Sequence, residues 1–403
     1  MKITHIHIER FRGFQNEDFE VGSLLTAIAG QNGTQKSTLL GIITQTFTLK
    51  TEDSMRVEKP LCGGSYISAF KDKFRLSPTF DKPKGHEWTI SFDAGMDDFT
   101  VESIKRTGDP NVRFWKKGAR QEGDGYISFP TIFLSLKRLV PVAEEAKIIT
   151  DDTLLTQEEL NEFKQLHNKI LIAQTPISSA TTITSKNKQS IGVSTELYDW
   201  NQNSMGQDNL GKIILALFSF KRLHDKYPRQ YKGGILAIDE MDATMYPASQ
   251  VELLKVLRKY ASKLNLQILF TTHSMSLLKA MDDLVQEVTK KEETANQAKI
   301  LYLKKVDDKI AIKQGVNFKG IQLDLNVVAE GNNRKKNRIT AYTEDKENIL
   351  FVKAILKSKA FVLDFVDVTL PCSTLMELVT KRVPAFIYPL IPQHFDLTLF
   401  ISS

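Results

Sequence analysis

The segment Gly30–Thr38 reads GQNGTQKST and decides the fold of the chain. It fits the phosphate-loop pattern G-x-x-x-x-G-K-[ST], except that Gln35 stands where a second glycine is usual. Leu24–Ala29 before it is apolar like a buried strand, and Ser37–Phe47 after it has the apolar spacing of a helix. A strand, a glycine-bearing loop and a helix in this order predict a site for a nucleoside triphosphate.

The chemistry of a triphosphate explains the residue types in this loop. Its oxygens need backbone N–H groups, a helix N-terminus, a lysine for the β and γ phosphates and a hydroxyl for Mg²⁺. If position 35 requires a positive φ, glutamine costs on the order of 1 kcal/mol relative to glycine. We assign the hydroxyl to Ser37. The residues predicted to contact ATP are Gly30, Asn32, Gly33, Thr34, Gln35, Lys36, Ser37 and Thr38.

Two further strands are predicted to end beside this loop. Gly234–Ile238 is followed by Asp239 and Glu240, and Ile268–Thr272 is followed by His273. The carboxyl ends of parallel strands form the ligand-binding edge of open α/β folds. Asp239 is therefore predicted to hold Mg²⁺ together with the loop serine, and Glu240 to orient or deprotonate the attacking water. His273 is predicted to contact the γ phosphate, so the catalytic set is Glu240, His273 and Lys36.

The order of elements predicts an α/β fold with a parallel sheet covered on both faces. An N-terminal strand is expected at Lys2–Glu9 and an antiparallel β portion at about 87–133. Asp151–Ala173 has helical spacing and opens an insert of about 151–195, whose Ser/Thr-rich end is β structure or a loop. Helices and buried strands then alternate as Leu210–Leu223, Gly234–Ile238, Ala248–Leu264 and Gln267–Thr271.

Composition indicates an ordinary soluble protein. The 403 residues are 41% hydrophobic and 25% charged, and no apolar run approaches the ~20 residues that cross a bilayer. We expect a cytoplasmic protein without a membrane partner. Cys62 and Cys372 are the only cysteines, too few for a disulfide framework. The net charge of +6 permits contact with nucleic acid.

These motifs resemble the ABC-ATPase superfamily, specifically its SMC-like and OLD (overcoming lysogenization defect) branch of DNA-associated and antiphage-defence ATPases. Phe11-Arg12-Gly13 matches an element that precedes the phosphate loop in this family, and Asn203–Asp208 resembles its signature motif. The resemblance implies that Ser204 and Gly206 meet the nucleotide of a second subunit, so that two heads sandwich ATP as a homodimer or higher oligomer. Asp242 matches the loop that crosses the dimer interface.

The C-terminal part, 338–403, resembles the start of the Toprim nuclease domain that follows the ATPase of OLD-like proteins. Ile339–Asp345 looks like its opening strand and acidic residue, which makes Glu344 a candidate remnant of a nuclease metal site. The Asp-x-Asp pair that completes such a site does not follow. We therefore expect an ABC-type ATPase domain at 1–330 and a partial or degenerate Toprim-like α/β domain at 338–403.

The functional hypothesis is an ATPase of an OLD-like antiphage system, requiring ATP and Mg²⁺. Head dimerisation would control a DNA nuclease on this chain or on a separate effector protein. Two alternatives remain: an SMC-like ATPase for DNA repair or recombination, and a nucleotide-dependent scaffold that binds ATP without turning it over. Gln35 favours the scaffold, whereas Glu240 favours hydrolysis.

Overall fold

The structure is a computed structural model. It describes residues 1–66, 73–93, 95–105, 112–119, 124–140, 148–151, 154–173, 175–185, 189–330, 339–343, 349–350, 352–354, 363–367 and 400–401. The chain forms two compact units, Met1–Gln322 and Leu323–Ser403, and each is described by itself.

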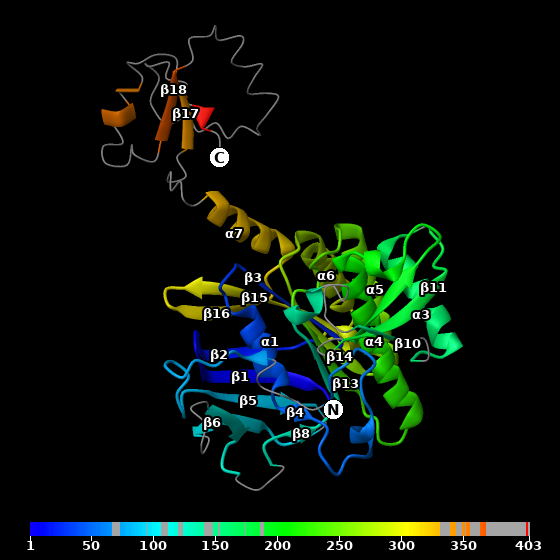
Figure 1. Cartoon of the computed structure of the whole chain (residues 1–403). Helices are drawn as coiled ribbons and strands as arrows, with labels where there is room; N and C mark the ends of the chain where they lie inside the picture. Colours follow the sequence, from blue (N-terminus) through cyan, green and yellow to red (C-terminus); the bar gives the residue numbers. More distant parts are fainter. Residues whose placement is uncertain are drawn as a thin grey trace. The chain divides into compact units, whose positions relative to one another are not determined.

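A six-stranded sheet forms the centre of the first unit (Figure 1). Neighbouring strands are parallel, except that the β15–β16 pair is antiparallel. The predicted parallel sheet is thus confirmed. In spatial order the strands are β16 (Lys309–Gln314), β15 (Ala298–Val306), β3 (Leu25–Gly30), β14 (Leu266–Thr272), β13 (Gly234–Ile238) and β9 (Thr131–Leu134).

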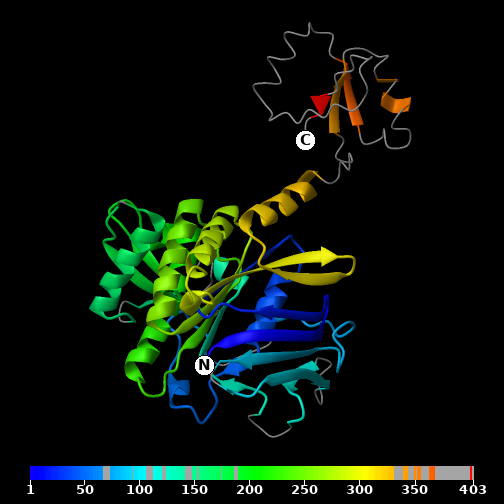
Figure 2. The same cartoon turned by 180° about the vertical axis from the view of Figure 1, so that it is seen from behind.

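Helices cover both faces of this sheet (Figures 1 and 2). On one face, α1 (Lys36–Thr44) packs against β3, β13 and β14. On the other, α5 (Pro247–Lys263) packs against β14, and α6 (Met275–Val288) packs against β15 and β3. The long helix α4 (Met205–Lys226) begins at an N-capping serine and precedes β13. Strand β13 is fully buried, as its run of apolar residues predicts.

A second, antiparallel sheet adjoins the first, and the two share one hydrophobic core with α1. Its strands are β2 (Phe14–Glu20), β1 (Ile3–Phe11), β5 (Glu87–Phe92), β6 (Phe99–Lys105) and β7 (Val112–Lys116). The prediction for 87–133 was wrong at its end, because β9 pairs in parallel with β13 in the other sheet. The predicted helix Ser37–Phe47 is also too long, since Phe47 opens the short strand β4 (Phe47–Thr48).

The insert before α4 combines a helix with a small sheet. Strands β10 (Ile149–Asp151), β11 (Ser179–Thr184) and β12 (Gln189–Ser194) pair antiparallel, and α3 (Gln157–Leu171) packs against α4 and α5. The helix α3 starts at Thr156, which forms a capping box with Glu159. The Ser/Thr-rich stretch is therefore β structure in its described part.

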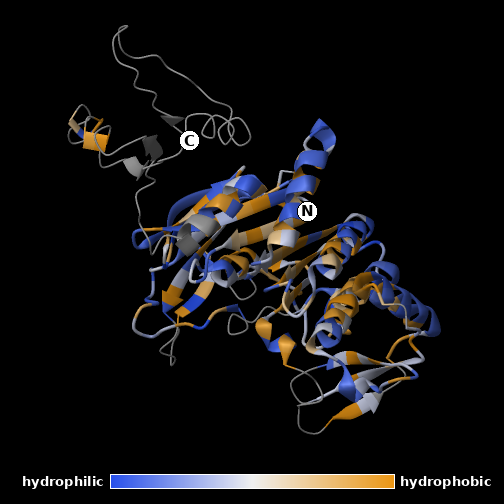
Figure 3. Cartoon of the chain, turned by 90° about the horizontal axis from the view of Figure 1, so that it is seen from above, coloured by the Kyte–Doolittle hydropathy of each residue, from blue (hydrophilic) through white to orange (hydrophobic). Residues whose placement is uncertain are grey.

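The helices of the first unit carry both hydrophobic and hydrophilic residues. Hydrophobic and hydrophilic residues alternate along its helices in Figure 3, as expected for helices with one buried face. Among the described residues, no helix is both long and apolar enough to cross a membrane.

Several short elements complete the first unit. They are η1 (Ser54–Val57), β8 (Ile127–Ser128), which pairs with β4, η2 (Leu136–Leu139), η4 (Trp200–Gln202) and η5 (Glu292–Thr294).

The second unit contains a small sheet. Strand β17 (Ile339–Thr343) pairs in parallel with β18 (Leu363–Asp367) and antiparallel with β19 (Phe400–Ile401). Helix α7 (Phe318–Glu330) leads from the first unit into it. Glu344, the candidate remnant of a nuclease metal site, lies outside the described residues.

A buried histidine in α3 makes stability depend on pH. His167 is 2% exposed, and neither ring nitrogen has a hydrogen-bond partner in the described structure. Burial lowers its pKa from 6.5 to about 4. The unfolded chain therefore binds the proton more tightly, and stability is lost as the pH falls from 6.5 towards 4. We expect a loss of about 3 kcal/mol from this residue.

His167→Leu should remove that loss, as measured by urea unfolding of the variant and the parent protein at pH 7 and pH 4.5. The exposed His224→Leu serves as the control and should keep the pH dependence of the parent. An unchanged pH dependence in His167→Leu would show that this histidine does not titrate on unfolding.

Candidate nucleotide site

The phosphate loop joins β3 to α1 with three residues in the left-handed region. Gly30, Gly33 and Gln35 have φ values of 152°, 81° and 62°. A Cβ on Gly30 would lie 2.4 Å from the carbonyl oxygen of Leu303, so glycine is required there by close approach. Gln35 is the N-cap of α1, without a side-chain cap bond. The backbone thus adopts the positive φ that glutamine tolerates poorly.

Lys36 lies folded over this loop. Its Nζ donates to the carbonyl oxygens of Gly30, at 3.1 Å, and Gln31, at 3.0 Å. Burial lowers the pKa of Lys36, while the carboxylates of Glu240 and Asp239 act in the opposite direction. A cation held at the loop by two weak carbonyl partners is free to exchange them for phosphate oxygens.

The residues predicted to hold Mg²⁺ contact one another although they are far apart in sequence. Ser37 Oγ donates to Asp239 Oδ1 at 2.8 Å, and Thr271 Oγ1 donates to the same oxygen at 2.7 Å. Asp239 is 5% exposed. Hydroxyl and carboxylate oxygens suit Mg²⁺, which usually takes only one or two protein ligands and completes its shell with water and phosphate. The described residues contain no cluster of three or more His, Cys, Asp or Glu that could hold a metal ion.

The turn after β13 brings the remaining predicted residues to the same edge. Glu240 has a left-handed backbone, with φ at 49°, and is partly exposed. The backbone N–H of His273 donates to the carboxylate of Asp242 at 3.3 and 3.4 Å. Burial and the nearby charge of Lys36 lower the pKa of His273. The structure therefore brings Lys36, Ser37, Asp239, Glu240 and His273 together.

Other loop residues surround this centre. Thr34 is buried, and its Oγ1 donates to the carbonyl oxygen of Gln31 at 2.8 Å. Asn32 and Gly33 are exposed at the loop tip. Thr38 Oγ1 lies 3.5 Å from an Arg12 Nη1, which places the Phe11-Arg12-Gly13 element beside the start of α1.

Arg12 itself is anchored in a polar hollow of about 590 Å³. Its guanidinium donates to both carboxylate oxygens of Asp81, at 3.0 and 3.1 Å. Although burial acts in the opposite direction, this pairing and further hydrogen bonds hold the pKa of Asp81 at about 2. The ion pair fixes Arg12 against α1.

The predicted signature residues lie at the start of α4. Ser204 caps α4 and forms a capping box with Gln207. A Cβ on Gly206 would lie 2.5 Å from the carbonyl oxygen of Thr244, so α4 begins directly against the segment that follows Glu240. Within the described residues, Ser204 shares no hydrogen bond with the phosphate loop.

Two site residues were missed by the sequence reasoning. Thr271 joins Asp239 to the backbone N–H of Glu240, which donates to its Oγ1 at 2.6 Å. Arg138, in η2, is 1% exposed and donates to the carbonyl oxygen of Glu240 at 2.8 Å. Thr271 stands in the predicted strand before His273, which is a usable signal. Nothing in SLKRLV marks Arg138.

Replacing Gln35 with glycine should stabilise the protein. The change removes a left-handed glutamine whose buried Oε1 has no partner among the described residues, and we expect unfolding to cost about 1 kcal/mol more. Urea unfolding of Gln35→Gly measures this. Lys84→Gly is the matched control, because exposed Lys84 has a similar φ of 61° but no orphaned amide, so its gain should be smaller. If both variants gained the same free energy of unfolding, the unpartnered Oε1 of Gln35 would not destabilise the protein.

One family model matches the second half of the site. The model of the family described as AAA ATPase domain matches residues 135–278. That range contains α4, β13 and β14, and the phosphate loop contacts the acidic strand across the sheet edge. The described part of the chain has a mixed α/β fold in which the phosphate loop and the acidic strand meet at one edge of the parallel sheet. A search of curated proteins gives no match.

Solved structures similar to the chain include heads of SMC proteins. The SMC head domain from Thermotoga maritima is 14% identical with a TM-score of 0.43, covering 78% of this chain and 100% of that one. An SMC head bound to the C-terminal winged-helix domain of ScpA is 14% identical with a TM-score of 0.45, covering 80% and 100%. An SMC head with an extended coiled coil, bound to the C-terminal domain of ScpA from Pyrococcus furiosus, is 13% identical with a TM-score of 0.43, covering 81% and 99%.

Proposed function

We propose that this chain is the ATP-hydrolysing ATPase of an OLD-like antiphage defence system. ATP-driven dimerisation of two heads would control a DNA nuclease, on this chain or on a separate effector. The observation that carries the hydrolytic part is the contact of Ser37 in the phosphate loop with Asp239 in the acidic strand, with Glu240 next in the chain. One edge thereby collects a phosphate cradle, oxygen ligands and a carboxylate base.

The residues divide the work of hydrolysis. Lys36 and the loop N–H groups bind the β and γ phosphates. Ser37 and Asp239 would hold Mg²⁺, whose charge would offset that of the phosphates. Glu240 accepts a proton from water as the water oxygen bonds to the γ phosphorus, and the bond to the β-phosphate oxygen breaks to release ADP. His273 donates a hydrogen bond from its ring to the transferred phosphate.

Dimerisation is supported by the exposed start of α4. Ser204 is exposed and Met205 is 44% exposed, so the N-terminus of a 22-residue helix is open to another molecule. A helix N-terminus attracts phosphate oxygens, which suits the nucleotide of a second copy. Asp242, beside His273, would lie at that interface. The Toprim-like region 338–403, with Glu344 as a candidate residue of a nuclease metal site, belongs to the same proposal.

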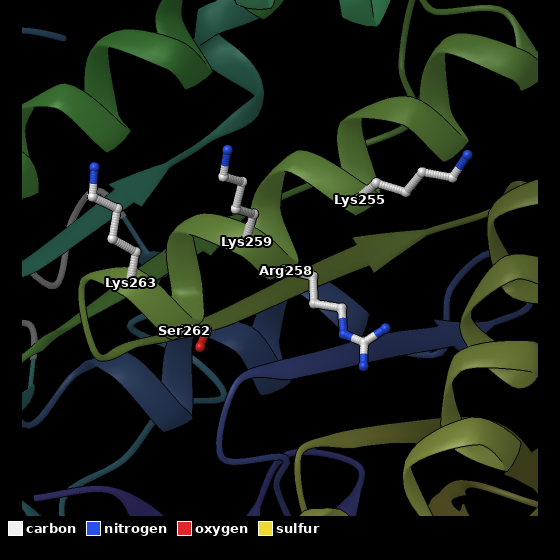
Figure 4. Close-up of a pocket in the computed structure, with 5 residues that line it drawn as sticks. All are labelled: Lys255, Arg258, Lys259, Ser262 and Lys263. Atoms are coloured by element: carbon white, nitrogen blue, oxygen red, sulfur yellow. The ribbon is translucent and has the colours of Figure 1, made fainter.

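Contact with DNA is supported by a hollow of about 480 Å³ along α5, in which every lining side chain is a cation or a hydroxyl (Figure 4). Lys255 pairs with Glu252 and Arg258 pairs with Glu287. For Lys259 and Lys263, no ion pair occurs within the described ranges. Lys255, Lys259 and Lys263 follow one another at about one helical turn, so they form a basic ridge about 12 Å long beside the hollow. Such a ridge suits consecutive phosphates of one strand, which rise about 3.4 Å per nucleotide.

Reversing two charges on this ridge should weaken DNA binding. Lys259→Glu/Lys263→Glu is expected to lower the affinity for duplex DNA about 10-fold or more and to reduce the salt slope by about 2. Fluorescence anisotropy at several salt concentrations measures both. Lys305→Glu/Lys313→Glu makes the same charge change on β15 and β16 and is the control. Equal losses in the two variants would leave only non-specific attraction, and α5 would not be the DNA surface.

Two measurements separate the whole proposal from its alternatives. Light scattering of the Glu240→Gln variant with ATP and Mg²⁺ should show a dimer that is absent without nucleotide. Plasmid cleavage that depends on ATP, by this chain or with an added effector, distinguishes the defence system from an SMC-like repair ATPase. Gln35 keeps the scaffold alternative open, because its left-handed backbone weakens the loop. ATP binding with dimerisation but without hydrolysis would select the scaffold.

A further inference from the structure

A buried arginine lies behind the proposed catalytic turn. Arg138, in η2, donates from Nε to Asn209 Oδ1 at 2.7 Å and from Nη2 to the carbonyl oxygen of Glu240 at 2.8 Å. Its Nη1 donates to the carbonyl oxygens of Leu134, at 3.2 Å, and Ser135, at 3.1 Å. One guanidinium therefore joins the end of β9, the first turns of α4 and the turn after β13.

Simple packing does not explain a charge at this position. Arg138 is 1% exposed, and within the described part of the chain no carboxylate lies at ion-pairing distance from it. Its four acceptors are neutral oxygens. Burial lowers its pKa to about 10, while Asp239, Glu240 and Asp242 act in the opposite direction. A buried cation without a direct ion pair costs stability, so this side chain has a role beyond packing.

Asn209 completes the link. It is fully buried on α4, and its Nδ2 donates to the carbonyl oxygen of Ala243 at 2.9 Å. Arg138 and Asn209 thus hold the carbonyl oxygens at the two ends of the segment Glu240–Ala243. Between these ends lies the left-handed backbone of Glu240, closed by a hydrogen bond from the N–H of Ala243 to the carbonyl oxygen of Glu240 at 3.1 Å.

We propose that Arg138 is a positioning residue that ties the start of α4 to Glu240. With the Glu240 carbonyl held on one side and Asn209 on the other, a shift of the first turns of α4 moves the catalytic turn with it. Engagement of that helix by a second copy would then aim the Glu240 carboxylate at the attacking water. The inference rests on the proposed function, because it takes Glu240 to be the base.

The chemistry of the guanidinium makes the link specific. Arginine presents five donors in a rigid planar fork, whereas lysine offers one compact ammonium. A lysine at 138 could keep the positive charge beside Asp239 and Glu240 but could not reach Asn209 and the Glu240 carbonyl in the same geometry. Arg138→Lys therefore separates the effect of charge from that of the link.

The first test compares turnover with binding. Arg138→Lys and Asn209→Ala should each lower kcat about 10- to 100-fold, as expected for a misaligned catalytic group, while the Kd for ATP stays within about 3-fold of the parent. In the double variant the effects should be less than additive, because both changes break one link. Arg222→Lys is the control and should keep the parent's kcat. Arg222 lies on α4 like Asn209, but it pairs with Glu159.

The second test does not depend on hydrolysis. Hydrogen exchange of the nucleotide-free protein should be faster at the Ala243 amide in Arg138→Lys and unchanged in Arg222→Lys. If Arg138→Lys fails to fold, Asn209→Ala alone is measured in the same way. A protein without turnover but with faster exchange would refute the proposed function and keep the link. Unchanged exchange, or a kcat that falls only in proportion to ATP affinity, would overturn the proposal.

Discussion

Glu240→Gln is expected to slow ATP turnover about 10²- to 10⁴-fold without weakening ATP binding. The glutamine keeps the size of the side chain and can still lie beside the attacking water, but it cannot accept its proton. The proposed metal ligand Asp239 is unaffected, because Ser37 and Thr271 bond to its carboxylate, and Thr271 contacts Glu240 only through the backbone N–H of Glu240. Phosphate release and isothermal titration calorimetry measure the two quantities on the same preparation.

The control for this variant is Glu292→Gln, which removes an exposed carboxylate in η5. It should turn over ATP at the parent rate. If Glu240→Gln hydrolysed ATP within about 3-fold of the parent rate, Glu240 would not be the general base, because removing a general base slows a reaction about 10²-fold or more.

Lys36→Ala has the second large expected effect, on binding. Its ammonium makes only two carbonyl contacts in the loop and is available for the β and γ phosphates. Loss of charge-assisted hydrogen bonds to phosphate costs about 3 kcal/mol, which corresponds to a Kd for ATP more than about 100-fold higher. Titration of a fluorescent ATP analogue measures the change, with Mg²⁺ present throughout.

A matched control is Lys309→Ala, which removes an exposed lysine at the start of β16. Its Kd should equal that of the parent. If Lys36→Ala bound ATP with the parental affinity, the nucleotide would not bind at the Gly30–Thr38 loop. The roles proposed for Ser37 and Asp239 would then be wrong as well.

The local motifs made the centre of the site predictable. A strand, a glycine-bearing loop and a helix are encoded within one short stretch, so Gly30–Lys36 could be located from sequence alone. The acidic pair could be placed at the same edge because parallel strands align their carboxyl ends. The structure supports the pairing through the contact of Ser37 with Asp239, which are 202 residues apart. The condition set on Gln35 is also met, since its φ is positive.

Features that depend on distant partners were not predictable in this way. The four residues of β9 alternate little, and only their register with β13 assigns them to the parallel sheet. Helix α6 and strands β15 and β16 were not identified, although they complete that sheet and its cover. Arg138 is one of two adjacent basic residues in SLKRLV, and only its partners, 71 and 102 residues away, distinguish it from Lys137. Sequence spacing carries no information about such contacts.

The most direct measurement is phosphate release from saturating ATP by the unaltered chain, with Mg²⁺ and then with excess chelator. We predict steady turnover that falls to background when the metal is removed. Ser37 and Asp239 are proposed to act on the phosphates only through the Mg²⁺ that they would hold. Stoichiometric ATP binding with no phosphate release in either condition would contradict the assignment of this edge as a hydrolytic site.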